Sequence, residues 1–318
     1  MSGHLVVTKL NDRLRDLRHT MEASVLPAGV VKKQHKAEAK ADSKAAKAEA
    51  KAAKAGVQES NEEEPSDTSD QTKRIFALQF EGDTRASGVD KLRREINAIL
   101  TMATKEDEVV VSIESPGGMV PNYGLAASQL TRFRDHEIPL TVVVDKVAAS
   151  GGYLMAVVAN KIIAAPFALV GSIGVVAQVP NVHKLLKKND VDVEVLTAGK
   201  YKRTLTTFGE NTEEGREKFK EELEDIHALF QEFVAEYRPE MELEKVATGE
   251  AWFGRRAIEL NLVDELATSD EIIMKACESS DVFSVAWQEQ KKPIERILGR
   301  VNGVLQQAEE LLARFSTR

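Results

Sequence analysis

The order of apolar and polar positions changes near residue 73. Beyond it, short β-branched runs alternate with segments whose apolar residues recur every three or four positions. The runs predict strands at RIFALQFEG (74–82), EVVVSIE (108–114), PLTVVVDKVAA (139–149) and VDVEVL (191–196). The intervening segments predict helices, as in DKLRREINAILTMA (90–103) and PNYGLAASQLTRFRDH (121–136). Strands separated by helices of roughly 12 to 15 residues predict parallel crossover units.

Residues 1–72 have a composition unlike that of the rest of the chain. Residues 32–55 are nearly all Ala, Lys and Glu, which favour a helix but leave almost nothing to bury. Residues 59–71 are acidic and poor in apolar side chains. We therefore expect 1–72 to be a basic tail with an acidic linker, largely disordered or an isolated helix. The Lys/Ala tract fits either a basic arm near anionic lipid or a solvated tether.

The last third of the chain has helical patterning. Asn211 or Thr212 is expected to cap a long helix that opens with acidic residues. We expect the folded domain to span 73–275 and an extension with an amphipathic helix to follow at 276–318. The apolar stripe of this helix, which packs either on the core or on a neighbouring subunit, comprises Ile294, Ile297, Val301, Val304, Leu305, Ala308, Leu311, Leu312 and Phe315.

Composition and charge restrict the class of protein. The 318-residue chain has a formal net charge of -8, so it lacks the basic face of a general nucleic-acid binder. Cys277 is the single cysteine, which excludes an internal disulfide. The sequence has no apolar run of about 18 residues or more, and its N-terminus lacks the apolar core of a signal peptide. We expect no metal or cofactor, because no cluster of metal ligands stands out.

Two glycine-rich turns follow strand-like runs. ESPGGMV (114–120) contains Gly118, where a backbone N–H group can approach a ligand. AASGGY (148–153) puts Ser150 at a helix start, where free N–H groups favour developing negative charge. Both turns are also compatible with plain packing, and a serine at a helix start is commonly a cap. If Ser150 is a nucleophile, the N–H groups of Gly151 and Gly118 form the donor pair that acyl transfer needs.

A serine nucleophile needs a base. No histidine lies in a glycine-bordered or strand-end setting, so a Ser-His-Asp triad is poorly supported. Lysine is the other option, because a lysine removed from water can be neutral near pH 7. TAGKYKRTLT (197–206) follows a predicted strand and offers Lys202, with Lys200 as the more exposed-looking alternative. In a third turn, VGSIGVV (170–176), Ser172 is either a turn residue only or a hydroxyl that orients a catalytic group.

These turns occur in an order similar to that of the signal peptide peptidase A family of serine proteases, which the chain resembles. It looks most like the short, single-repeat branch of SohB-like proteases. The resemblance covers about residues 73–275, and its motifs, highly specific in combination, are ESPGGMV, DKVAASGGYLMA, GSIGVVAQ, TAGKYKRTLT, GENTEEGREKF and ATGEAWFGRRAIELNLVDE. The resemblance implies an α/β fold of the Clp protease/crotonase type, with repeated ββα units and a helical C-terminal part.

The resemblance also implies a Ser-Lys peptidase that uses neither metal nor cofactor. The nucleophile of the family falls on Ser150, its general base on Lys202, and the serine that bonds this lysine on Ser172. The oxyanion hole of the family falls on Gly118 and Gly151. The implied activity is that of an endopeptidase acting through an acyl-enzyme on peptide or unfolded protein substrates. Signal peptide remnants and misfolded membrane-associated proteins are the implied substrates.

The setting implied by the resemblance is the bacterial inner membrane. Relatives form homo-oligomeric rings or domes, with the Ser-Lys pair completed within one chain or between neighbours. They carry a single membrane-spanning helix at the N-terminus, which this chain lacks, so the chain looks like the soluble part of such a protein. Two other functions stay open: a non-catalytic oligomeric membrane-associated scaffold, and a crotonase-type acyl-CoA enzyme, which also uses a two-amide oxyanion hole.

Overall fold

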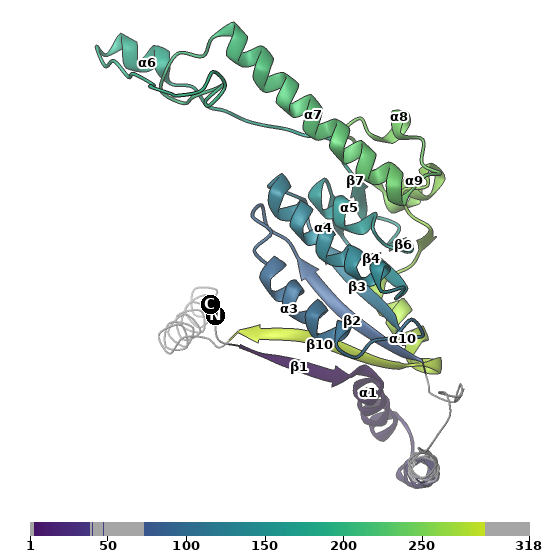
Figure 1. Ribbon diagram of the computed structural model, residues 1–318. Coiled ribbons are helices and arrows are strands. Elements are labelled where there is room, and N and C mark those ends of the chain that lie inside the picture. Colours follow the sequence, from purple (N-terminus) through teal and green to yellow (C-terminus); the bar gives the residue numbers. More distant parts are fainter. Residues whose placement is uncertain (1–2, 39, 41–46, 48–72, 290–318) are drawn as a thin grey trace, which may run out of the picture.

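Two β-sheets organise the computed structural model, which describes residues 3–38, 40, 47 and 73–289 (Figure 1). The larger sheet has the strand order β1-β10-β2-β3-β4-β6-β9, and the smaller one has the order β5-β7-β8. Within the described residues, the larger sheet is parallel except for the pair of β1 and β10. The α/β class with parallel crossovers, predicted from the sequence, is confirmed.

The strands predicted at 74–82 and 108–114 agree with the observed ones, whereas the strand predicted at 139–149 is divided between the two sheets. The larger sheet contains β1 (Gly3–Lys9), β10 (Asp281–Glu289), β2 (Arg74–Glu81), β3 (Glu108–Glu114), β4 (Leu140–Val144), β6 (Lys161–Ala164) and β9 (Glu265–Leu266). The smaller sheet contains β5 (Val147–Ala149), β7 (Leu169–Gly171) and β8 (Ala251–Phe253). The helices are α1 (Leu10–Val25), α3 (Val89–Leu100), α4 (Val120–Asp135), α5 (Gly151–Ala156), α6 (His183–Lys188), α7 (Glu213–Tyr237), α8 (Leu243–Val246), α9 (Gly254–Ala257), the 3-10 turn η1 (Ile258–Leu260) and α10 (Ser269–Ser279).

Helices cover both faces of the larger sheet, which explains why its central strands are apolar at nearly every position. Successive residues of a strand point to opposite faces. Phe76 of β2 therefore lies in the core under α3, α4 and α5, whereas its neighbour Ile75 lies in a second cluster with Ile273 of α10. Figure 1 shows α3 and α4 on one side of the sheet and α10 on the other. All five residues of β4 are buried.

A repeated unit builds the smaller sheet beside the larger one. After β4 the chain runs into β5 and then α5, and after β6 it runs into β7. After β3, Ser115 forms a parallel bridge with Ala148 of β5 before α4 begins. Each time, the first segment joins the larger sheet and the second joins the smaller one. This repetition confirms the predicted ββα units.

The first strand corrects the prediction that residues 1–72 lie outside the folded domain. β1 pairs antiparallel with β10 in a continuous register from Gly3 opposite Glu289 to Lys9 opposite Phe283. The partners come from opposite ends of the chain, so no local pattern indicates the pairing. β10 in turn lies in the region predicted to be an extension, 276–318, and continues the sheet through β2.

Asn11 fastens α1 to the end of β10. Its side-chain amide donates to the carbonyl oxygens of Ser280 (2.8 Å) and Cys277 (3.1 Å) and accepts from the N–H of Val282 (2.8 Å). Residues 3–25 therefore belong to the folded domain. The acidic linker at 59–71 and the predicted apolar stripe at 294–315 lie outside the described residues.

An arm projects from the body of the molecule and carries α6 and the N-terminal part of α7 (Figure 1). The predicted cap of α7 is confirmed, because the Thr212 hydroxyl accepts from the N–H of Gly215 at 3.1 Å. The strand predicted at 191–196 is wrong. These residues, all described, pair with no strand, and Val191, Val193 and Val195 are exposed. Alternating residues form a strand only where a neighbouring backbone supplies the hydrogen bonds.

Replacing Asn11 tests whether residues 3–25 are part of the folded domain. Asn11→Ala removes three hydrogen bonds, each worth roughly 0.5–1.5 kcal/mol net. We expect the free energy of unfolding, measured by chemical denaturation, to fall by about 2–4 kcal/mol. Asn189→Ala is the matched control, because the Asn189 side chain bonds the carbonyl of Leu185 within its own exposed helix end. Equal free energies of unfolding for the two variants would contradict the inclusion of residues 3–25 in the folded domain.

Candidate active site

Ser150 has a backbone conformation that an L-residue rarely adopts. Its φ is 52° and its ψ is -119°, and it directly precedes α5. Such conformations persist where the surrounding structure enforces them, and they are common at functional sites. The N–H of Ser150 donates to the carbonyl of Gly171 at 2.8 Å. Within the described residues its side chain makes no capping bond to α5, so the cap interpretation lacks its defining contact.

The smaller sheet brings the three predicted turns to one edge. β5 and β7 pair in parallel with Ala149 opposite Gly171, so Ser150 and Ser172 follow at neighbouring strand ends. The Pro-Gly-Gly turn leaves the same edge, because the Ala149 N–H donates to the carbonyl of Ser115 at 3.0 Å. Parallel pairing therefore gathers turns that are far apart in the sequence.

The Pro-Gly-Gly turn packs directly against Ser150. Gly117 has a φ of +88°, and a Cβ there would lie 2.7 Å from the Gly151 nitrogen and 2.8 Å from the Ser150 Cβ. A Cβ on Gly118 would lie 2.1 Å from the carbonyl oxygen of Thr84. Only glycine fits at these two positions. The backbone of the turn and the start of α5, whose first N–H groups have no intrahelical partner, thus lie side by side.

Two buried side chains that the sequence analysis missed support this turn. The hydroxyls of Ser115 and Tyr123 are 2.5 Å apart, and the Gly117 N–H donates to the Ser115 hydroxyl at 3.1 Å. The Tyr123 hydroxyl also donates to the carbonyl of Asp83 at 2.7 Å. Burial raises the pKa of Tyr123, so its hydroxyl keeps the proton that it donates. In the sequence, Ser115 could have been noticed because it immediately precedes Pro-Gly-Gly.

Ser150 opens into an apolar cavity of about 260 Å³ between α4, α5 and α7. Gly118 and Gly151 line the same cavity beside Ser150. The other lining residues are mostly aliphatic and aromatic: Val120, Tyr123, Gly124, Ala127, Ser128, Leu154, Gly174, Val175, Ile226, Leu229, Phe230 and Phe233. A cavity of this composition fits an apolar segment of a ligand.

Ser172 lies at the same edge but is not among the residues lining the cavity. Its φ is 53°, and its N–H donates to the carbonyl of Glu250 at 2.7 Å. Its hydroxyl donates to the carbonyl of Gly249 at 3.3 Å. The hydroxyl can also accept a hydrogen bond, so it can hold a further donor beside Ser150.

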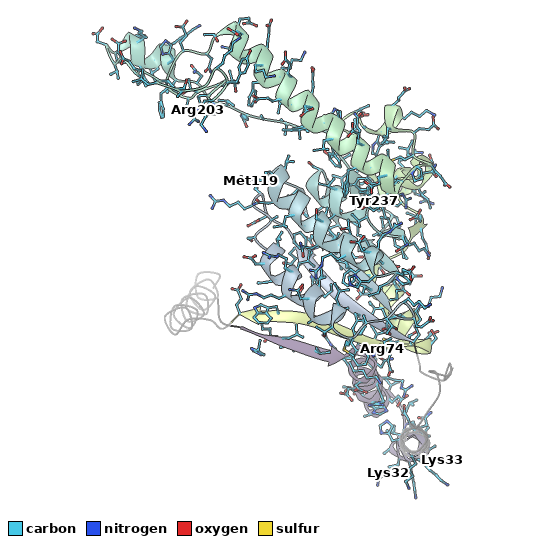
Figure 2. The ribbon with its side chains drawn as sticks, viewed as in Figure 1. Lys32, Lys33, Arg74, Met119, Arg203 and Tyr237 are labelled. Atoms are coloured by element: carbon cyan, nitrogen blue, oxygen red, sulfur yellow. The ribbon has the colours of Figure 1, made fainter. Side chains whose placement is uncertain are left out.

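Within one chain, Lys202 does not lie with the other predicted site residues. It is exposed, belongs to the arm, and is absent from the residues that line the cavity. Figure 2 labels its neighbour Arg203 on the arm and Met119, next to the Pro-Gly-Gly turn, on the body. The structure therefore brings together Ser150, Gly118 and Gly151, with Ser172 adjacent, and leaves out the predicted base.

Lys200, the alternative base, is held in its charged form. Its ammonium forms an ion pair with Glu214 at 2.9 Å and lies 4.9 Å from the centre of the Tyr201 ring. Hydrogen bonding to Tyr201 and the pair with Glu214 raise the pKa of Lys200 above its ordinary value. A general base must be neutral before it acts, so these contacts disfavour Lys200.

The described histidines make no hydrogen bond to Ser150. His227 of α7 is the one near the site: its Nε2 lies 3.2 Å from the carbonyl oxygen of Ile173 and 3.1 Å from the Gln231 amide. His183 is on the arm, where its Nδ1 lies 3.3 Å from the carbonyl oxygen of Phe208. These contacts direct both imidazoles to groups other than Ser150.

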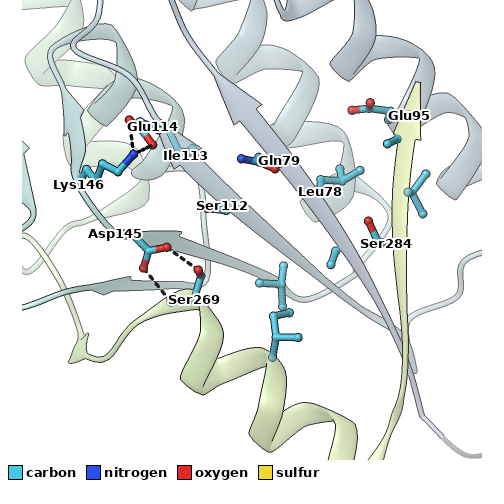
Figure 3. A pocket seen from close by; sticks show the side chains of 15 residues that line it. Leu78, Gln79, Glu95, Ser112, Ile113, Glu114, Asp145, Lys146, Ser269 and Ser284 are labelled. Carbon is cyan, nitrogen blue, oxygen red and sulfur yellow. Dashed lines mark hydrogen bonds and ion pairs between the residues drawn. The ribbon is translucent and has the colours of Figure 1, made fainter. Parts of the chain in front are cut away.

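A second cavity, of about 410 Å³, lies on the opposite face of the larger sheet, beside α10 (Figure 3). Its charged side chains have partners within the protein, and Glu95 accepts from the N–H of Trp287 at 2.7 Å. Lys146 pairs with Glu114 at 2.9 Å, and Asp145 accepts from the N–H of Ser269 at 2.8 Å and from its hydroxyl. None of the predicted site residues lines it. These contacts tie α10 to the sheet.

None of the described helices combines the length and the apolar composition that a transmembrane helix needs.

Solved structures similar to this chain are peptidases of low sequence identity. A mutant of the 1510-N membrane-bound stomatin-specific protease in complex with a substrate peptide has a TM-score of 0.45 at 11% identity, covering 72% of this chain and 98% of that one. A ClpP1 mutant from Listeria monocytogenes has a TM-score of 0.40 at 12% identity, covering 63% of this chain and 93% of that one.

Relatives of known sequence are much closer. "Probable protease SohB" of Haemophilus influenzae is 54% identical over 248 residues, covering 77% of this chain and 68% of the relative. "Probable protease SohB" of Buchnera aphidicola subsp. Acyrthosiphon pisum is 51% identical over 243 residues, covering 76% of this chain and 72% of the relative. The family models of the peptidase family S49 N-terminal region and of peptidase family S49 match residues 1–130 and 132–282. The chain belongs to peptidase family S49 and is a serine peptidase.

Proposed function

We propose that the protein is an endopeptidase in which Ser150 is the nucleophile and Lys202 of a neighbouring copy is the general base. The observation that carries the proposal is the state of Ser150. Its backbone is held at φ 52°, its hydroxyl is not used as a helix cap, and it faces an apolar cavity beside the Pro-Gly-Gly turn. A serine held in this way for packing alone has no evident benefit to offset the backbone strain.

The reaction follows from the groups around Ser150. The neutral amine of Lys202 takes the hydroxyl proton, and the Ser150 oxygen attacks the peptide carbonyl. The N–H groups of Gly118 and Gly151 stabilise the resulting oxyanion. The protonated lysine then donates its proton to the leaving amine, and the acyl-enzyme forms. Water, deprotonated by the same lysine, hydrolyses the ester and restores Ser150.

The position of the arm supports a base supplied by a second copy. Lys202 lies in a segment with exposed apolar side chains: Val176 is 93% exposed, Leu196 is 87% exposed and Tyr201 is 45% exposed. Burying these side chains against another subunit is favourable and removes water from the lysine between them. Removal of water favours the neutral amine, which is the form that a general base needs. Self-association therefore accounts both for the placement of Lys202 near Ser150 and for its neutral form.

Ser172 is proposed to orient the incoming lysine. It follows β7 at the edge where Ser150 follows β5, and its hydroxyl donates to the carbonyl of Gly249. With its proton directed to that carbonyl, the oxygen of Ser172 has lone pairs left to accept from the lysine amine. An amine held in this way can direct its own lone pair to Ser150.

The substrate class follows from the apolar cavity beside Ser150. Extended peptide segments with small or apolar side chains fit such a lining. Signal peptide remnants and misfolded membrane-associated proteins have this chemistry, and the family relationship supports them as substrates. The proposal includes a ring or dome of identical subunits at the bacterial inner membrane.

Covalent labelling tests Ser150 as the nucleophile. A fluorophosphonate probe is expected to label the wild-type protein on Ser150, located by peptide mass spectrometry. Ser150→Ala should give no labelling and lower peptide hydrolysis by roughly 10³-fold or more. Ser128→Ala is the control, because Ser128 lines the same cavity without a strained backbone. Labelling of Ser150→Ala at the wild-type rate would refute the assignment.

Comparing variants of Lys202 and Lys200 distinguishes the loss of a catalytic base from the general effect of removing a positive charge. Lys202→Ala should lower the rate of acylation by about 10²- to 10⁴-fold, the usual contribution of a general base. Lys200→Ala should stay close to wild type, because Lys200 is held charged by Glu214 and Tyr201. Both rates are measured by stopped-flow probe labelling at matched oligomeric state. If Lys200→Ala lowers the acylation rate and Lys202→Ala does not, Lys200 is the base and Lys202 is not.

Mixed oligomers test whether the site is shared between copies. Ser150→Ala and Lys202→Ala subunits, each inactive alone, are combined in equal amounts under conditions in which fluorescence energy transfer demonstrates subunit exchange. If each base comes from the next subunit of a ring, random mixing restores about a quarter of the wild-type sites. A site within one chain restores none. No recovery despite proven exchange would refute the shared site and leave the nucleophile assignment intact.

A further inference from the structure

The sequence repeats a short pattern of His, two residues and Glu near the N-terminus. The two copies are HTME, with His19 and Glu22, and HKAE, with His35 and Glu38. The first lies on α1 and the second on the helix formed by residues 28–38. Residues three apart on a helix share one face, so each copy presents an imidazole and a carboxylate together. We call α1 with residues 28–38 the N-terminal hairpin.

The two copies face each other across the N-terminal hairpin. The Nε2 atom of His19 lies 2.9 Å from Glu38 Oε2, and the Nε2 atom of His35 lies 3.2 Å from Glu22 Oε2. These crossed pairs show that the two helices run antiparallel. The imidazole rings lie against each other, with centroids 4.0 Å apart and planes inclined by 37°. The four side chains are 22% to 35% exposed, so they are partly shielded and remain accessible to small ions.

Three side chains of this cluster bring donor atoms close together. One donor atom each of His19, Glu22 and His35 lie within 4.8 Å of one another. Ligand atoms bound to the same tetrahedral zinc ion are roughly 3.3 Å apart, a separation that follows from Zn–N and Zn–O distances near 2.0 Å. Binding an ion therefore requires these side chains to rotate toward one another. Glu38 is not part of this group of three, but its Oε2 lies 2.9 Å from His19 Nε2, so it is within reach of the same ion as a fourth donor.

We propose that His19, Glu22, His35 and Glu38 bind a divalent first-row transition metal such as zinc. Imidazole nitrogen with carboxylate oxygen is a donor set that suits this class of ion. Four protein ligands leave no open position, which is typical of a structural site rather than a catalytic one. The ion fixes the two helices of the N-terminal hairpin to each other. Because Asn11 fastens α1 to β10, it also fixes the direction in which the chain leaves the domain.

Replacing Arg18 distinguishes a metal site from a cluster held together only by ion pairs. Its guanidinium contacts Glu38 and lies 3.7 Å from Glu22, so it occupies carboxylate oxygens that a metal would use. A fixed positive charge also repels a cation. If the cluster is a metal site, removing Arg18 strengthens metal binding. If the cluster holds the N-terminal hairpin by ion pairs alone, removing Arg18 only loosens the hairpin.

Calorimetric titration with ZnCl₂ tests the site in the full, untagged, chelator-treated chain. We expect one ion per chain with wild type. His19→Ala and Glu22→Gln should each weaken binding at least about tenfold, and Glu22→Gln keeps the shape of the side chain. His136→Ala is the control, because the His136 ring bonds the carbonyl of Arg132 outside the cluster. Absence of binding to the wild type, or equal binding by all variants, would overturn the site.

Hydrogen exchange of the hairpin amides, read by mass spectrometry, provides a second measurement. Zinc should slow exchange at residues 10–38 in the wild type and leave His19→Ala unchanged. Arg18→Gln should bind zinc more tightly than the wild type while its metal-free hairpin exchanges faster. If Arg18→Gln weakens zinc binding as much as His19→Ala does, the cluster acts through hairpin stability and the proposed ligation is wrong. Neither readout depends on peptidase activity.

Discussion

The parallel pairing of β5 with β7 is the interaction on which the site depends. The hydrogen bond from the Ser150 N–H to the Gly171 carbonyl forces the chain to turn sharply between β5 and α5, at φ 52°. The bridge of Ser115 to Ala148 extends the same pairing to the Pro-Gly-Gly turn. These two backbone pairings thus position Ser150, the adjacent Gly118 and Gly151 amides and Ser172. Preorganisation of this kind is what stabilisation of an oxyanion requires.

The same pairing explains why Lys202 is not part of this edge. After β7 the chain leaves the sheet and enters the arm, so Lys202 is carried away from the strand ends that hold Ser150 and Ser172. Among the described residues, the cavity of one chain therefore combines Ser150 with Gly118 and Gly151 but does not include Lys202. In the proposed assembly, an isolated subunit is inactive and proteolysis starts only where copies meet. Such an arrangement restricts an apolar cavity with a reactive serine to the assembled particle.

Much of the fold could be predicted because its signals are local. The β-branched runs at β2, β3 and β4 and the spacing of Leu92, Ile96 and Ile99 on α3 report burial directly. The motif order gave Ser150, Gly118 and Gly151, which line one cavity. The misses have nonlocal causes. The partner of β1 is β10, at the other end of the chain, and the ligands of the proposed metal site lie on two helices that only folding brings together.

The wrongly predicted strand at 191–196 bears on the proposed assembly. Its alternation of Val191, Val193 and Val195 with acidic residues is the pattern of a strand with one buried face, yet all three valines are exposed in the single chain. An exposed β-branched face of this kind favours association with another chain. The segment immediately precedes the loop that carries Lys202. In the proposed assembly, a second subunit docked on the arm would both cover these valines and receive Lys202.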